Sequence, residues 1–260
     1  MAMTPVERIE PPSVAEFEAR YVKRSRPVIL RGAIRHWPAV REWSGDYFKR
    51  RWGDRQVPVA RVRDGAIAYQ PDAGVQFETI RIAEYVDRLA PGEPIDLFMF
   101  FRIHEVLPDL FADVVRPPYC SDVRWFRSRF WYGGPATRSP LHRDLPENLY
   151  AQVAGRKSFI LLDRRLTRMV HRHSFLSGVP NFSPVDAAAP DLTRYPRFRD
   201  APLMIAHLEP GDLFYIPSFW WHQGHSAETS MSLSLWWTRG AMVPVARAAE
   251  LFMRVRGIRI

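Results

Sequence analysis

Residues 139–162 read SPLHRDLPENLYAQVAGRKSFILL and contain two runs typical of β-strands, NLYAQVAG and RKSFILL. The runs meet at a glycine, which favours a turn between two strands. His142 and Asp144 precede them at a spacing of two, so on a strand their side chains point to the same side. Lys157 opens the second run in a chain that has only three lysines. Strand formation alone explains none of these three polar residues.

Outward from this stretch, short strand-like runs separated by Gly and Pro turns dominate from about residue 123 to residue 240. In SMSLSLWW the larger apolar residues share one face, and they are Met231, Leu233, Leu235 and Trp237. The other face holds Ser232, Ser234 and Trp236. Several such strands at close spacing predict an antiparallel jelly-roll barrel. The segment 164–202 is too long for a plain turn, so we expect it to be functional or specially packed.

The first part of the chain mixes helix and strand. Helical spacing favours helices at 12–24, 41–53 and 80–92, and alternation favours strands at 27–32 and 56–63. We therefore predict a mainly β (α+β) fold in one compact unit. Its expected parts are an N-terminal α/β region (1–120), a double-stranded β-helix or jelly-roll core (121–240) and a C-terminal helix (241–260).

Composition places the chain among globular proteins, with 47% apolar and 25% charged residues. No apolar run is long enough for a membrane span, and the N-terminus lacks a signal peptide's apolar core. We expect a soluble cytoplasmic protein without a membrane partner. The single cysteine, Cys120, excludes an internal disulfide.

The net charge of +9 leaves a nucleic-acid partner open without identifying one. Removing the three lysines from the 37 basic residues leaves 34 arginines, a bias that indicates a GC-rich, bacterial genome. The arginines spread along the chain, so nucleic acid is the less favoured partner.

His142 and Asp144 supply two thirds of a facial triad of two histidines and one carboxylate, the arrangement that holds Fe(II) with open coordination positions. His222 is the best third ligand, because it follows a tight turn, an apolar strand and two bulky aromatics. His225 is expected beyond that strand. The pair His171 and His173 lies in an Arg-rich loop and is interpreted as surface. Taken alone, a His and an Asp two positions apart equally fit a solvated strand face.

Four blocks together resemble the JmjC/cupin-like family of Fe(II)- and 2-oxoglutarate-dependent oxygenases, whose members include asparaginyl hydroxylases and a tRNA wybutosine hydroxylase. The blocks are RPVILRGAIRHWPAVREW, SPLHRDLPENLYAQVAGRKSFILL, FSPVDAAAPDLTRYPRF and LEPGDLFYIPSFWWHQ with the following SLSLWWTRG. They cover about residues 27 to 240 in the family's order.

The resemblance implies a role for individual residues. His142, Asp144 and His222 match the iron ligands, with 2-oxoglutarate and O2 at the open positions. Lys157 matches the residue that pairs with the distal carboxylate of 2-oxoglutarate. Ser139 and Asn148 match further co-substrate contacts. A buried dicarboxylate needs a compensating cation, and the compact ammonium of lysine suits a narrow pocket.

The chain also departs from the family pattern. A co-substrate tyrosine of several members has no clear equivalent in the stretch LFMFFR (97–102), which leaves Tyr132 or Arg129 as substitutes. An asparagine of the closing strand is Leu235 here. We expect the substrate pocket to be lined by a small set of mostly aromatic residues, namely Tyr132, Trp221, Leu235 and Trp237.

The resulting hypothesis is a dioxygenase that hydroxylates an unactivated C–H bond of a protein or peptide side chain and releases succinate and CO2. Alternative substrates are a small metabolite, a natural-product intermediate or a modified tRNA base. A non-catalytic cupin-like metal-binding or sensor module is the alternative outside enzymology, and Zn or Mn could occupy the same ligands. An apolar face of the C-terminal helix could pair two subunits into a homodimer.

Overall fold

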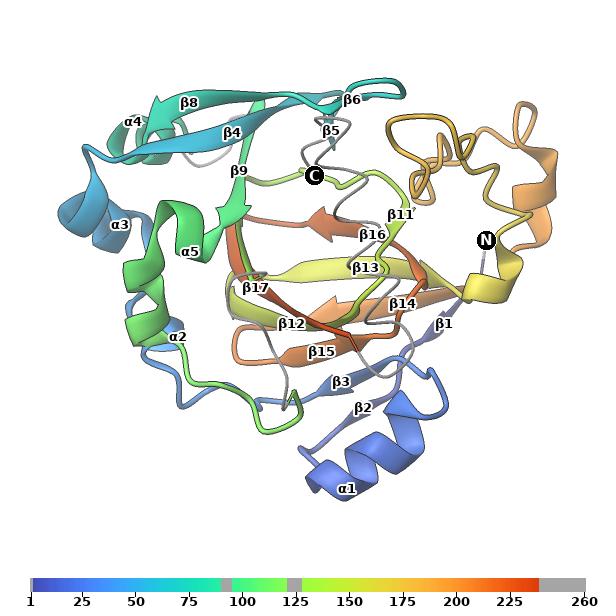
Figure 1. Ribbon diagram of the computed structural model, residues 1–260, viewed down its shortest axis with the longest axis horizontal. Helices are drawn as coiled ribbons and strands as arrows, with labels where there is room; N and C mark the ends of the chain where they lie inside the picture. The colour runs from blue at the N-terminus through green and yellow to red at the C-terminus, as the bar shows by residue number, and fades with distance from the viewer. Residues whose placement is uncertain (1, 90–94, 121–127, 239–260) are drawn as a thin grey trace.

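The computed structural model describes residues 2–89, 95–120 and 128–238 (Figure 1). Its centre is a barrel of two four-stranded antiparallel sheets. The first sheet holds, in spatial order, β15 (Leu213–Ile216), β12 (Glu147–Ala154), β17 (Ser230–Trp237) and β10 (Arg129–Gly133). The second holds β14 (Leu203–Leu208), β13 (Lys157–Leu162), β16 (Trp221–Ser226) and β11 (His142–Arg143). The chain crosses repeatedly between the two sheets, which confirms the predicted jelly roll.

Strands from the N-terminal region widen both sheets. The first sheet gains β3 (Val28–Leu30) and β2 (Arg8–Ile9) beside β15, and it gains β9 (Leu97–Arg102), β4 (Gln56–Arg63), β5 (Ala66–Ile67) and β8 (Phe77–Arg81) beyond β10. In the second sheet, β1 (Met3–Pro5) pairs with β14 in parallel. A small hairpin of β6 (Tyr69–Gln70) and β7 (Gly74–Val75) stands apart. Because the barrel's own sheets continue into these strands, the N-terminal region is built onto the barrel.

Short helices accompany these strands. They are α1 (Val14–Phe17), which continues as the π-helix η1 (Glu18–Val22), α2 (Pro38–Glu42), α3 (Gly45–Trp52), α4 (Ile82–Arg88), α5 (Ile103–Val106) and the 3₁₀ helices η2 (Pro108–Asp113), η4 (Arg164–Leu166) and η5 (Pro196–Asp200). The hydroxyls of Ser13 and Ser44 accept backbone N–H groups at the starts of α1 and α3, which stabilises both N-termini. The predicted C-terminal helix and its dimer contact lie outside the described residues. None of the described helices is long and apolar enough to cross a membrane.

The two faces of β17 separate the core from the barrel interior. Leu233 and Leu235 belong to the largest apolar cluster, together with Phe17 of α1 and Phe48 of α3. Ser232 and Ser234 face the opposite way, into the barrel, and both are buried. The main core therefore lies outside the barrel, between its first sheet and the N-terminal helices. The predicted alternation of this strand is confirmed, and its small inner side chains leave space inside the barrel.

The long segment 164–202 packs on the outer face of the second sheet. Its Val170 and Phe198 share an apolar cluster with Ile160 of β13 and Trp221 of β16. In Figure 1 the segment, coloured yellow to orange, lies on the side of the barrel opposite α3 and α4. It therefore covers the second sheet as the helices cover the first.

Candidate functional site

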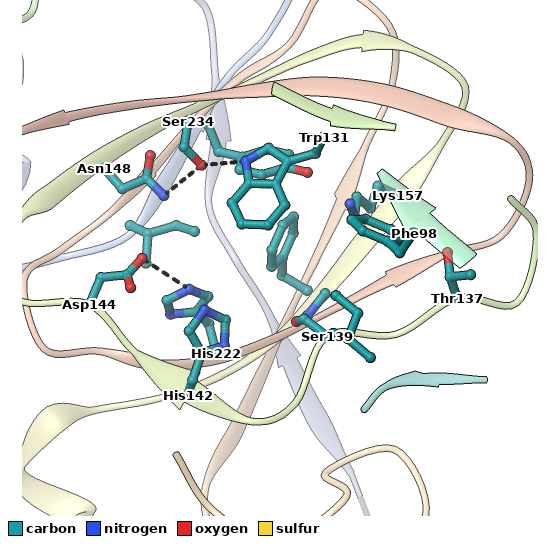
Figure 2. Close-up of a pocket in the computed structure, with 15 residues that line it drawn as sticks. Phe98, Trp131, Thr137, Ser139, His142, Asp144, Asn148, Lys157, His222 and Ser234 are labelled. Atoms are coloured by element: carbon teal, nitrogen blue, oxygen red, sulfur yellow. Dashed lines mark hydrogen bonds and ion pairs between the residues drawn. The ribbon is translucent and has the colours of Figure 1, made fainter. Parts of the chain in front are cut away.

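Three residues meet at the open edge of the second sheet. His142 lies on β11, Asp144 follows that strand by one residue, and His222 lies directly across from His142 on β16. Each offers one ligand atom, and these atoms lie within 4.8 Å of one another. His222 Nε2 is 3.7 Å from Asp144 Oδ2, and the two imidazole centroids are 4.3 Å apart (Figure 2). The structure thus brings together the three side chains that the sequence predicted as ligands.

Backbone carbonyls fix the tautomer of both histidines. The Nδ1–H of His142 donates to the Pro140 carbonyl at 2.8 Å, and that of His222 donates to the Trp220 carbonyl at 2.9 Å. Each Nε2 is therefore left with a lone pair for a metal. Burial, helped by the nearby His142, lowers the pKa of His222 to about 4 against smaller opposing effects of Asp144 and the Trp220 carbonyl. His222 is consequently neutral, the form that binds metals, throughout the physiological pH range.

The donor set fits a divalent transition metal. Two imidazole nitrogens and one carboxylate oxygen on one side of a site form a facial triad, which suits Fe(II) and leaves positions open for other ligands. Within the described residues, no other group of three His, Cys, Asp or Glu side chains could hold a metal. The single cysteine, Cys120, is buried elsewhere among apolar residues.

A pocket opens next to the triad, between the two sheets. Its apolar walls are Ile67, Phe98, Trp131, Phe159 and Ile216. Its polar lining includes the three ligands at one end and Lys157 farther in (Figure 2). The metal ligands therefore form part of the wall of a mostly apolar pocket with a few polar groups, which is typical of small-molecule sites.

Lys157 is the cation of this cavity. Its side chain is 8% exposed, and its Nζ lies 5.5 Å from the ring centroids of both Phe98 and Tyr150. None of the described carboxylates forms an ion pair with it, and burial lowers its pKa to about 7. A buried ammonium without a counter-charge is unfavourable, so this position favours an anionic ligand.

Gly224 and Ser139 complete the surroundings of Lys157. A Cβ at Gly224 would lie 3.0 Å from Phe159 Cε1 and 3.4 Å from Lys157 Cε, so glycine leaves room for the Phe159 ring and lies in contact range of the lysine stem. The Gly224 N–H donates to Ser139 Oγ at 2.8 Å. Since the Ser139 oxygen accepts this bond, its own proton is available to a ligand in the cavity.

Asn148 faces the cavity through a hydrogen-bonded chain. Its side chain is 3% exposed, and its Nδ2 lies 3.4 Å from Ser234 Oγ, which also accepts the Trp131 indole N–H at 2.9 Å. Asn148 Oδ1 is buried without a hydrogen-bond partner among the described residues. Turning the amide over lets the Ser234 hydroxyl donate to Oδ1 and points the amide N–H into the cavity. That orientation suits a carboxylate ligand.

None of the four residues expected to line the substrate pocket lines the cavity next to the triad. Tyr132, Leu235 and Trp237 belong to the core outside the barrel, and Trp221 faces the cluster beneath segment 164–202. Because strand side chains alternate, the cavity is lined instead by an adjacent residue on each of the three strands. These residues are Trp131 on β10, His222 on β16 and Ser234 on β17.

Neither of the two residues named as substitutes for the co-substrate tyrosine lines the cavity. Tyr132 points away from the cavity, so it is not a substitute. Arg129 shares the inner face of β10 with Trp131 and stacks on Trp236 at 4.9 Å, but it does not line the cavity. Phe98 of the LFMFFR stretch lies beside Lys157 instead. The first five residues of LFMFFR are all apolar, so the sequence alone does not show which face of β9 turns toward the cavity.

The other histidines lie outside the ligand group. The expectation that His225 lies beyond the strand is wrong. His225 is within β16, which continues past His222 to Ser226, the residue opposite Lys157 of β13. His173 pairs with the Tyr69 hydroxyl at 2.9 Å, and the His171 ring lies 5.2 Å from the Tyr195 ring in a tilted arrangement. These two therefore form loop contacts, as their sequence context indicated.

Comparison with known proteins gives a consistent picture. The sequence model of the cupin-like domain matches residues 14–241. Lysine-specific demethylase 8 of Xenopus tropicalis is 31% identical over 242 residues, which are 90% of this chain and 53% of that protein. The human bifunctional peptidase and (3S)-lysyl hydroxylase JMJD7 is 28% identical over 269 residues, covering 88% of this chain and 82% of that protein.

Human tRNA wybutosine-synthesizing protein 5 is 26% identical over 253 residues, covering 90% of this chain and 78% of that protein. Relatives named for lysine demethylation are longer. The chain spans 53% of the Xenopus demethylase and 58% of its Danio rerio counterpart. The match to these longer relatives is thus a match to about half of each.

Proposed function

The chain belongs to the cupin-like domain family, and on that premise we propose that it is an Fe(II)- and 2-oxoglutarate-dependent oxygenase. The observation that carries the proposal is the facial triad beside a cavity whose buried lysine has no counter-charge among the described residues. Bound Fe(II) and 2-oxoglutarate supply the oxidation. One atom of O2 enters succinate, which forms with CO2, and the other enters a hydroxyl group on the substrate carbon.

The residues of this chain then have distinct tasks. His142, Asp144 and His222 would hold Fe(II) through the two Nε2 atoms and one carboxylate oxygen. Lys157 and Ser139 would bind the distal carboxylate of 2-oxoglutarate, and Asn148 would face the co-substrate from the metal end. The apolar walls exclude water, which strengthens each of these charge interactions.

A protein or peptide side chain is the proposed substrate. It is supported by relatives named as a lysyl hydroxylase and as demethylases, whereas a small molecule and a tRNA base remain the alternatives. Apart from the metal ligands and Lys157, the described lining carries no charged group. A substrate ammonium would have no counter-carboxylate there, so we propose that the hydroxylated carbon belongs to an uncharged side chain.

Succinate formation tests this function. Protein purified without oxygen and supplied with Fe(II), 2-oxoglutarate, ascorbate and air should form succinate, because such enzymes commonly turn over slowly without substrate. A mixed peptide library in the same reaction should gain one oxygen atom per peptide at uncharged residues, as located by mass spectrometry. Tight binding of Zn without succinate formation would instead support a metal-binding module, and hydroxylation at lysine or arginine would contradict the substrate class.

The affinity for 2-oxoglutarate should depend on pH. Lys157 in the empty cavity has a pKa of about 7, so it is charged below that pH and loses its charge above it. The dicarboxylate requires the charged form, and the apparent Kd should rise by about tenfold per pH unit above pH 7. Calorimetry with Mn(II)-loaded protein measures this rise.

The nearby His222 and His225 do not produce this pH dependence. His222 is already neutral in this range, and burial lowers the pKa of His225 below its usual value, with Arg138 adding to the shift. Mn(II) affinity measured without 2-oxoglutarate serves as the control. A Kd for 2-oxoglutarate that stays constant up to about pH 9 would contradict the role of Lys157.

A further inference from the structure

Two turns meet behind the metal ligands. Residues 144–146 connect β11 to β12 and begin with Asp144, and residues 217–220 connect β15 to β16 and lead to His222. The Phe219 N–H donates to the Asp144 carbonyl at 2.7 Å, and the Ser218 hydroxyl donates to the Leu145 carbonyl at 2.5 Å. We name this pair of hydrogen-bonded turns the clasp. It joins the two chain segments whose side chains must converge on one metal.

Glu147 holds the clasp from within. Its carboxylate is buried, with the residue 8% exposed, and Oε2 accepts the Ser218 N–H at 2.9 Å and the Tyr215 hydroxyl at 2.7 Å. One side chain of β12 therefore restrains both the end of β15 and the turn that follows it. Hydrogen bonds to a carboxylate are stronger than those between neutral groups, so this restraint is a firm one.

The second turn needs such a restraint. Phe219 has a φ of +62°, a left-handed conformation that bulky residues rarely adopt and that persists only where the surroundings impose it. The next residue, Trp220, supplies the carbonyl that orients the ring of His222. A relaxed turn would therefore shift both the position and the tilt of this ligand.

We propose that Glu147 is a positioning residue, which sets the separation of Asp144 and His222 and thereby the affinity of the triad for its metal. The inference rests on the proposed function only in that the triad binds a divalent metal. Glu147 touches neither the metal nor a substrate, and it acts through Ser218 and Phe219.

Asp212 provides a matched control for general stability. Like Glu147, it is a buried carboxylate that accepts backbone N–H groups, those of Gly32 at 3.1 Å and Glu209 at 2.9 Å. It lies in the turn between β14 and β15, away from the clasp. Loss of either carboxylate should destabilise the fold, but only loss of Glu147 should alter the metal site.

Mn(II) titration by calorimetry, well below the melting temperature of every variant, tests the proposal. Glu147→Ala should weaken Mn(II) binding by about 10- to 100-fold, the usual effect of losing a residue that orients ligands. Glu147→Gln keeps an acceptor oxygen and should stay within about threefold of wild type. Asp212→Ala should lower the melting temperature and leave Mn(II) affinity within about twofold.

Further readouts keep the test decisive. The visible absorption of Co(II)-loaded Glu147→Ala should change in intensity, because the coordination geometry changes. If this variant does not fold, Ser218→Ala removes only the hydroxyl link and should weaken Mn(II) binding by about 3- to 10-fold. A folded but destabilised Glu147→Ala variant that binds Mn(II) with wild-type affinity would overturn this inference and leave the proposed function standing. Wild-type protein that binds no Mn(II) would overturn the proposed function and the inference together.

Discussion

Asp144→Ala should lower succinate formation by at least about a thousandfold. The change removes the carboxylate of the triad and leaves two neutral imidazoles, His142 and His222, to hold a divalent cation. Metal chemistry contributes several kcal/mol to such reactions, and each 1.36 kcal/mol corresponds to about a factor of ten. Succinate release and Mn(II) titration measure the two losses together.

Asp186→Ala is the control for this change. Asp186 pairs with Arg138 at 3.1 Å and accepts from Gln223 at 2.9 Å, outside the triad. This variant should retain metal binding and turnover. Metal-dependent succinate formation at the wild-type rate by Asp144→Ala would contradict the assignment of the triad.

Lys157→Met should weaken 2-oxoglutarate binding by about 100-fold or more while Mn(II) affinity stays unchanged. Truncating one partner of a buried charge pair typically costs about 2 to 5 kcal/mol. Lys157→Arg should rescue little, since the planar guanidinium is broader than the compact ammonium that this buried position holds. Calorimetry on Mn(II)-loaded protein measures both affinities, and wild-type affinity in Lys157→Met would contradict the role of the lysine.

The same variant should make the ligand-free protein more stable at neutral pH. The folded pKa of Lys157 lies below its unfolded value, so the unfolded chain binds more protons between them. The resulting penalty is fully present below pH 7 and disappears as pH rises to the unfolded pKa. The gain in melting temperature of Lys157→Met should therefore shrink as the pH approaches about 10.

Several strands were predictable almost residue by residue. The runs QVPVARVR and SMSLSLWW coincide with β4 (Gln56–Arg63) and β17 (Ser230–Trp237). Alternation and Gly or Pro turns are local signals, so they need no knowledge of the fold. β16 reads WHQGHS and lacks that signal, because its inner positions hold a metal ligand and the glycine beside Lys157.

The site was predictable only where spacing or family resemblance identified it. His142 and Asp144 are close in sequence, the turn, strand and aromatics before His222 favoured it as the third ligand, and the resemblance gave Lys157 its role. Which residues line the pocket depends on which face of each strand turns inward. A shift of one residue in the assignment of a strand exchanges its two faces. Hence Tyr132 was expected where Trp131 lies. The contact of Phe98 with Lys157 joins distant segments and has no local signal.

The two-faced strand β17 also bears on how this scaffold can change. Leu233 and Leu235 anchor the core on one side, and Ser232 and Ser234 border the interior on the other. Substitutions at Ser234, which lines the cavity, can change the shape of that cavity while the apolar residues on the other face stay in place. Alternate residues of β17 thus contribute to the apolar core and to the barrel interior. The interior can therefore change, by evolution or by design, while the core that stabilises the fold is kept.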